Sequence, residues 1–154
     1  MHAKVELLRT FRGWFDLGQD FLYGVFDREE TEVLGGTGLH RSVGPEAREI
    51  GYWIATAHTG KGLATEAVRA LCRVGFELDA LDRIEIHCDP ENIKSAAIPA
   101  RLGFVHEATL RRRHQDGRPR PRTMVWTMLH EEYLASEIPK APIEAYDGAG
   151  YRLI

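Results

Sequence analysis

The segment HTGKGLATEA, residues 58–67, places two glycines and a lysine directly before a run of small apolar residues. Because glycine has no Cβ, Gly60 and Gly62 let the backbone wrap closely around a ligand. The unpaired N–H groups at the start of a helix favour bound anions, and Lys61 adds a cation. The segment indicates a phosphate cradle, although a turn that only begins a helix has the same composition. It lacks the spacing of a nucleotide P-loop and the third glycine of a dinucleotide-binding turn.

A second unusual segment is ENIKSAAIPARLGF, residues 91–104, which has the pattern of a helix with a proline inside it. Asn92 is a good N-cap, and Gly103 is a helix stop. Pro99 removes one backbone N–H and clashes with the preceding turn, which costs about 3 kcal/mol in an ordinary helix interior. The carbonyl that loses its partner belongs to Ser95, which also carries a hydroxyl. The irregularity is either a tolerated kink or a local opening around a ligand.

These two segments must be positioned by a mixture of helices and strands. Apolar residues near helical spacing predict helices over residues 3–15 and from the glycine turn to about residue 79. Alternating, aromatic and β-branched runs predict strands at residues 21–27, 31–43, 48–55, 82–89, 104–113 and 122–133. The pair Asp116-Gly117 is a turn signal between the last two strands. The order of elements predicts an α/β (α+β) fold with a largely antiparallel sheet and helices at two crossovers.

Composition narrows the class of protein. The 154 residues are predicted to form a single domain over residues 1–138 with an irregular tail over residues 139–154. The formal net charge of -3 argues against a dedicated nucleic-acid binder. Cys72 and Cys88 have no metal-ligand spacing, and we interpret them as buried, reduced thiols of a cytoplasmic protein without a metal site. No run has the length of a signal peptide's apolar region or of a membrane span.

Two segments together carry a resemblance to a known family: EIGYWIATAHTGKGLATEAV and DPENIKSAAIPARLGFVHEATLRRR. In order and separation they resemble the Gcn5-related N-acetyltransferase (GNAT) superfamily, and within it the branch typified by ribosomal-protein-alanine acetyltransferases. The family's Q/R-x-x-G-x-G/A signature falls on residues 57–62, with Ala57 in the Gln/Arg position. The resemblance implies a mixed, mostly antiparallel sheet that is splayed at its centre and flanked by helices. It also implies acetyl-coenzyme A (acetyl-CoA) as the cofactor, wedged into the split.

The resemblance further implies which residues hold the cofactor. Backbone groups of Trp53, Ile54 and Ala55 are expected to pair with the pantetheine arm. Asn92 and Ser95 are expected to face the pantetheine and the thioester. The pyrophosphate is expected on the glycine turn and the first helical residues, which are Gly60, Lys61, Gly62, Leu63, Ala64 and Thr65.

The implied reaction moves an acetyl group from the thioester to a primary amine of a small molecule or a protein N-terminus. Because only a neutral amine attacks, a base must take its proton. We predict Glu49 for this role, and its alternative role is a surface ion pair with Arg48 or Arg41. Ser95 is the predicted proton donor to the leaving thiolate, and a backbone N–H on strand 48–55 would stabilise the oxyanion.

Two histidines are further candidates for the site. His87, on the strand predicted at residues 82–89, and His114, near the last turn, are alternative bases or acceptor-binding residues, since an unperturbed histidine titrates near pH 6.5. Their other interpretation is structural or solvent-facing. The basic run at residues 111–122 is either a solvated hairpin or a grip for an acidic substrate or the ribosome surface. Arg122 stands where family members often have Asp, which weakens any inference of a ribosomal-protein acceptor.

Relatives usually begin with a strand and a helix ahead of the segment that opens this sequence. Their absence predicts an exposed sheet edge at FLYGVFD, and therefore either a homodimer that covers this edge or a start site placed too late. Besides an N-acetyltransferase, the sequence allows a non-catalytic acyl-CoA-binding module. An RNA- or ribosome-interaction domain would rest on the arginine-rich run alone.

Overall fold

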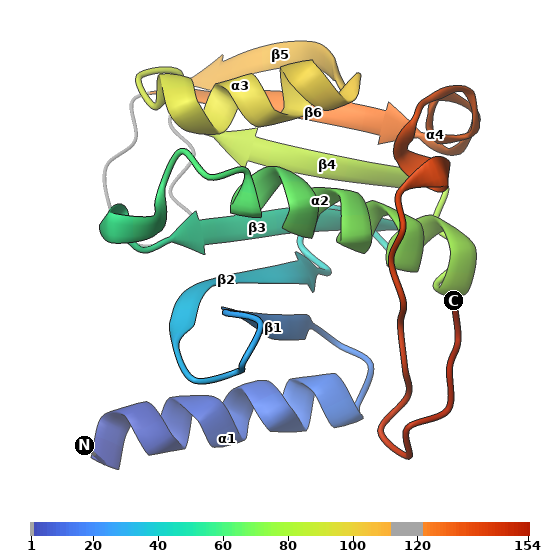
Figure 1. Cartoon of the computed structure of the whole chain (residues 1–154). Helices are drawn as coiled ribbons and strands as arrows, with labels where there is room; N and C mark the ends of the chain where they lie inside the picture. The colour runs from blue at the N-terminus through green and yellow to red at the C-terminus, as the bar shows by residue number, and fades with distance from the viewer. Residues whose placement is uncertain (1, 112–121) are drawn as a thin grey trace.

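The computed structural model describes residues 2–111 and 122–154 as helices arranged around one six-stranded sheet (Figure 1). The helices are α1 (His2–Asp16), α2 (Leu63–Arg73), α3 (Ile93–Leu102) and α4 (His130–Ala135), with short turns η1 (Thr56–His58), η2 (Val74–Leu78) and η3 (Ile138–Lys140). The strands are β1 (Phe21–Phe26), β2 (Val33–His40), β3 (Ala47–Ile54), β4 (Arg83–Cys88), β5 (Val105–Arg111) and β6 (Arg122–Leu129). The predicted α/β class and the order of the main elements are confirmed.

The sheet has the strand order β1-β2-β3-β4-β6-β5, and all neighbouring pairs are antiparallel except β3 and β4. Helices α2 and α3 lie on one face of the sheet (Figure 1). The core lies between this face and the helices, where the fully buried Ile50, Ile84 and Ile86 meet Val68 and Cys72 of α2. None of the helices within these two ranges is long and apolar enough to cross a membrane.

The central feature of the sheet is a gap between its two parallel strands. In the described residues, β3 and β4 pair only at their first positions, Ala47 with Arg83, Arg48 with Ile84 and Glu49 with Glu85. Beyond these pairs, residues 50–54 and 86–88 continue as strands that pair with their outer neighbours, β2 and β6. The splayed sheet expected from the family resemblance is therefore confirmed.

The two helices beside the gap start and stop where their sequences indicate. Helix α2 begins after Gly62, whose φ of 86° is left-handed, and no side chain of the described residues caps its first turn. Helix α3 begins after Asn92, whose side-chain oxygen accepts a hydrogen bond from the Ser95 N–H at 3.1 Å. It ends at Gly103, which adopts a φ of 87° that glycine tolerates without strain. The N-cap and the stop predicted for α3 are both confirmed.

The largest boundary difference from the sequence prediction is at the end of the last strand. The strand expected at residues 122–133 ends at Leu129, and the chain then forms α4. Leu129 remains extended, and its N–H donates to the Glu132 carboxylate at 2.8 Å, which is the reciprocal half of a capping box. The side chains of α4 also pack against η2, where Tyr133 stacks on Phe76 at 4.6 Å between ring centroids. Local capping and this tertiary contact therefore override the strand pattern.

Candidate functional site

A groove of about 1940 Å³ connects the polar face of the sheet to the gap between β3 and β4. Its walls include Glu49, Tyr52 and Ser95, together with residues of α1, β1 and β2. Side chains of successive strand residues point to opposite faces, so Glu49 and Tyr52 lie on different faces of β3. The groove therefore passes through the sheet where the strands separate, and it brings the predicted base and the predicted proton donor to one opening.

The glycine turn before α2 has the geometry of an anion site. Gly60 and Gly62 have φ values of 79° and 86°, which L side chains rarely adopt, and a Cβ added at either would meet no atom within 4 Å. As far as the described residues go, the space beside the turn is thus open. Among the hydrogen bonds of the described residues, none uses the backbone N–H of residues 63–65 as a donor. Lys61 is exposed at the same turn. These unpaired donors, the helix N-terminus and the cation fit a phosphate group.

The edge of β3 that faces the gap differs in part from the expectation. The Ala55 N–H donates to the Leu34 carbonyl at 2.8 Å, and the Ala55 carbonyl accepts from the His58 N–H at 2.8 Å. Residues along an antiparallel strand alternate between bonding edges, so Ile54 directs its backbone groups into the gap whereas Trp53 and Ala55 face β2. The backbone role expected of Ala55 is therefore corrected, because both of its groups are engaged within the chain, and Trp53 shares its orientation.

Ser95 and Tyr52 close the helix side of the gap. The Tyr52 hydroxyl donates to the Ser95 carbonyl at 3.0 Å, and the Ser95 hydroxyl donates to the Tyr52 oxygen at 3.2 Å. This carbonyl is the one that Pro99 deprives of its helical partner. The proline is buried inside α3, so the open carbonyl predicted from the sequence is present and is satisfied across the gap. Burial raises the pKa of Tyr52 to about 12.

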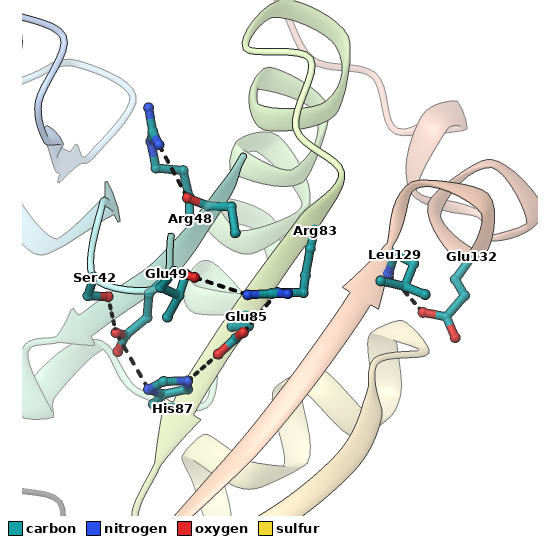
Figure 2. Close-up of polar contacts among 10 residues, drawn as sticks. Ser42, Arg48, Glu49, Arg83, Glu85, His87, Leu129 and Glu132 are labelled. Carbon is teal, nitrogen blue, oxygen red and sulfur yellow. Dashed lines mark hydrogen bonds and ion pairs between the residues drawn. The ribbon is translucent and has the colours of Figure 1, made fainter. Parts of the chain in front are cut away.

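On the opposite face of the sheet, polar side chains form a continuous chain (Figure 2). The Ser42 hydroxyl donates to a Glu49 carboxylate oxygen at 2.5 Å, and His87 Nδ1 lies 3.5 Å from the same oxygen. His87 Nε2 lies 2.6 Å from Glu85, whose other oxygen forms an ion pair with Arg83 Nε at 2.9 Å. Glu49 is 13% exposed at its side chain and lines the groove, so it is placed to meet an acceptor.

Three further residues named in the sequence predictions are Arg48, His87 and His114. Arg48, one alternative partner of Glu49, pairs with Asp79 at 3.1 Å. The side chain of His87 has 0% exposure although the residue lines the groove, and its role in binding an acceptor stays a prediction. His114 and most of the basic run lie outside the described residues.

Sequence reasoning missed three members of the polar chain, Ser42, Glu85 and Arg83. For Glu85, the sequence signal was its alternation with His87 along β4, which places both side chains on one face. The contact with Glu49 depends on the parallel register of β3 and β4, and no local pattern specifies that register.

Comparison with known proteins identifies the family. A model of the acetyltransferase (GNAT) domain matches residues 3–105. The Bacillus licheniformis protein named "Uncharacterized N-acetyltransferase p20" is 38% identical over 95 residues, which covers 61% of this chain and 53% of that protein. The ribosomal protein uS5-alanine N-acetyltransferase of Escherichia coli (strain K12) is 35% identical over 107 residues, covering 68% of this chain and 54% of that enzyme. The chain thus spans about half the length of these two relatives.

A solved structure has the same fold. Mycobacterium smegmatis RimJ, in complex with CoA-disulfide, superposes with a TM-score of 0.80 over 90% of this chain and 66% of that one, at 24% identity. At this identity the similarity concerns the fold. The family model carries the assignment, since it matches more than half of the sequence and includes both segments that border the gap. We conclude that the chain belongs to the GNAT acetyltransferase family.

Proposed function

We propose that this protein is an N-acetyltransferase that moves the acetyl group of acetyl-CoA to a primary amine by direct attack on the thioester. The observation that carries the proposal is the gap between β3 and β4, because the groove that reaches it is lined by Ser95 and Tyr52 from one face of the sheet and by Glu49 from the other. The bound CoA-disulfide of M. smegmatis RimJ supports the choice of cofactor. The buried thiols of Cys72 and Cys88 support a cytoplasmic location.

The residues present fit this cofactor. The N–H groups of residues 63–65, which have no hydrogen-bond partner in the described part of the chain, and the glycine turn would hold the pyrophosphate, with Lys61 at the rim. Ile54 would pair with the pantetheine arm through backbone groups that face the gap. Asn92 and Ser95, which line the groove at the start of α3, would border the thioester end.

Glu49 and Ser95 would divide the proton transfers. Acetyl-CoA supplies a thioester whose carbonyl carbon accepts a neutral amine and whose sulfur leaves as a thiol. Glu49 takes the proton of the attacking amine, because its carboxylate lines the groove where the acceptor enters. Ser95 donates its hydroxyl proton toward the sulfur, which requires the hydroxyl to turn away from Tyr52. Both groups border the same opening, so the acceptor and the cofactor can meet there.

A thiol-release assay with acetyl-CoA and a panel of amines tests the proposal. The panel contains peptide N-termini, polyamines, aminoglycosides and amino-acid analogues, and the E. coli relative named for an alanine of uS5 justifies the peptides. We expect amine-dependent thiol release that falls at least about tenfold in Glu49→Gln and in Ser95→Ala, because proton transfer contributes factors of this order or more. Calorimetric titration of acetyl-CoA should show that both variants still bind it.

The same experiment separates the proposal from its alternative. Tight binding of acetyl-CoA without turnover on any amine would identify a non-catalytic acyl-CoA-binding module. Turnover that neither substitution lowers would show that the two assigned roles are wrong, although the activity is right.

A further inference from the structure

A buried imidazole separates two carboxylates at the point where β3 and β4 stop pairing (Figure 2). Glu49 and Glu85 are directly opposite each other in the last parallel pair. His87 follows Glu85 by two residues and therefore lies on the same face. Its Nε2 is 2.6 Å from Glu85 and its Nδ1 is 3.5 Å from Glu49, while its side chain has 0% exposure. One ring thus contacts both carboxylates.

Each of the two carboxylates also contacts a second polar side chain. Arg83 pairs with Glu85 at 2.9 Å and also donates to the Val43 carbonyl at 3.0 Å. Ser42 donates to Glu49 at 2.5 Å. Like charges directly opposite on a sheet are destabilising, so two carboxylates at this register require a hydrogen-bond donor between them. The imidazole supplies it, and its position also keeps β3 and β4 in register at the mouth of the gap.

We propose that His87 is a positioning residue for Glu49, holding that carboxylate at the mouth of the gap through a clamp anchored on Glu85 and Arg83. The proposal rests on the proposed function of Glu49 as the base. It differs from the alternative role of His87 as a base, because the ring, whose side chain has 0% exposure, contacts Glu49 and Glu85. Within residues 2–111 and 122–154, the ionisable groups that face the clamp include His40, opposite Glu49 on β2, and its partner Asp20.

Two substitutions of His87 test the contacts of its two ring nitrogens separately. In His87→Asn the amide occupies the position of Nδ1 and keeps a donor toward Glu49. In His87→Gln the amide reaches the position of Nε2 and keeps a donor toward Glu85. If the clamp positions Glu49, the Asn variant retains more turnover than the Gln variant. His106→Asn is the matched control, since His106 is an exposed histidine on β5 outside the groove.

The measurements are kcat and KM for the best amine of the panel, their pH dependence, acetyl-CoA affinity by calorimetry, and the thermal midpoint. We expect kcat of His87→Gln to fall about tenfold or more while acetyl-CoA affinity changes less than about twofold. The acidic limb of the kcat/KM profile should shift, because the substitution removes the ring that lies between Glu49 and Glu85. His106→Asn should match the wild type in all four measurements.

Folded His87 variants with wild-type kcat and an unmoved acidic limb would overturn the proposal. So would a loss confined to thermal stability and cofactor affinity, which is the signature of a purely structural residue. If both His87 variants fail to fold, Glu85→Gln carries the test: a folded Glu85→Gln protein should show a lowered kcat with normal acetyl-CoA affinity, and a wild-type kcat there would refute the clamp. An inactive wild-type protein would instead overturn the proposed function and this inference together.

Discussion

Tyr52 shows how one buried side chain acquires a role that its own segment does not indicate. Its ring packs against the hydrophobic core, and its hydroxyl reaches the Ser95 backbone on another element. Sequence patterns predicted the open Ser95 carbonyl, because the effect of Pro99 four residues later is local. They did not predict the donor that satisfies it, because Tyr52 and Ser95 are brought together only by tertiary structure.

The raised pKa of Tyr52 gives a prediction for alkaline unfolding. Burial raises the pKa of Tyr52 to about 12 from the ordinary tyrosine value of 10.0, so the unfolded chain ionises this phenol first as the pH rises. The contribution of Tyr52 to the free energy of unfolding is therefore complete below pH 10.0 and is lost as the pH rises toward about 12.

Denaturant titrations between these pH values measure the effect. Because Tyr52→Phe has no phenol to ionise, its free energy of unfolding should decline less steeply with pH than that of the wild type. Equal slopes for the two proteins would contradict the burial of this hydroxyl.

At the scale of elements, Pro99 and Tyr52 connect α3 to β3 across the gap. The proline withholds the N–H that would bond the Ser95 carbonyl, and the tyrosine replaces it. In Pro99→Ala the residue 99 N–H can bond this carbonyl, so the tyrosine hydroxyl becomes redundant. We predict that Tyr52→Phe lowers the free energy of unfolding by about 1 kcal/mol in the wild type and by clearly less in Pro99→Ala.

A double-mutant cycle with urea unfolding tests this coupling. Tyr151→Phe, on the exposed tail, is the control and should be additive with Pro99→Ala. If Tyr52→Phe has the same effect in both backgrounds, the hydrogen bond across the gap does not replace the bond that the proline removes.

The elements themselves were predictable to different degrees. The stripe of Val68, Leu71 and Cys72 and the caps of α3 are local signals, and these helices appear where the sequence places them. The end of β6 was not predictable from apolar alternation, because the Glu132 capping contact and the stacking of Tyr133 on Phe76 decide it. The candidate site shows the same division: the glycine turn is a local pattern, whereas the clamp around His87 depends on register.

At the scale of the whole molecule, the edge of the sheet is formed by β1. Phe26 on this strand is 48% exposed, and Val33, its neighbour on β2, is 51% exposed. An exposed edge favours association with another strand, so the homodimer expected from the sequence stays a prediction. Sizing chromatography with light scattering should give the mass of a dimer, and a monodisperse monomer would contradict it.

Amide hydrogen exchange with and without coenzyme A tests most directly whether the gap and the glycine turn hold the cofactor. The N–H groups of residues 63–65 have no hydrogen-bond partner among the described residues, so they should exchange fast in the free protein. We predict that coenzyme A slows exchange in peptides covering residues 50–55 and 60–65 and leaves β5, at the far edge of the sheet, unchanged. Coenzyme A that binds by calorimetry but slows exchange only elsewhere would contradict the proposed site.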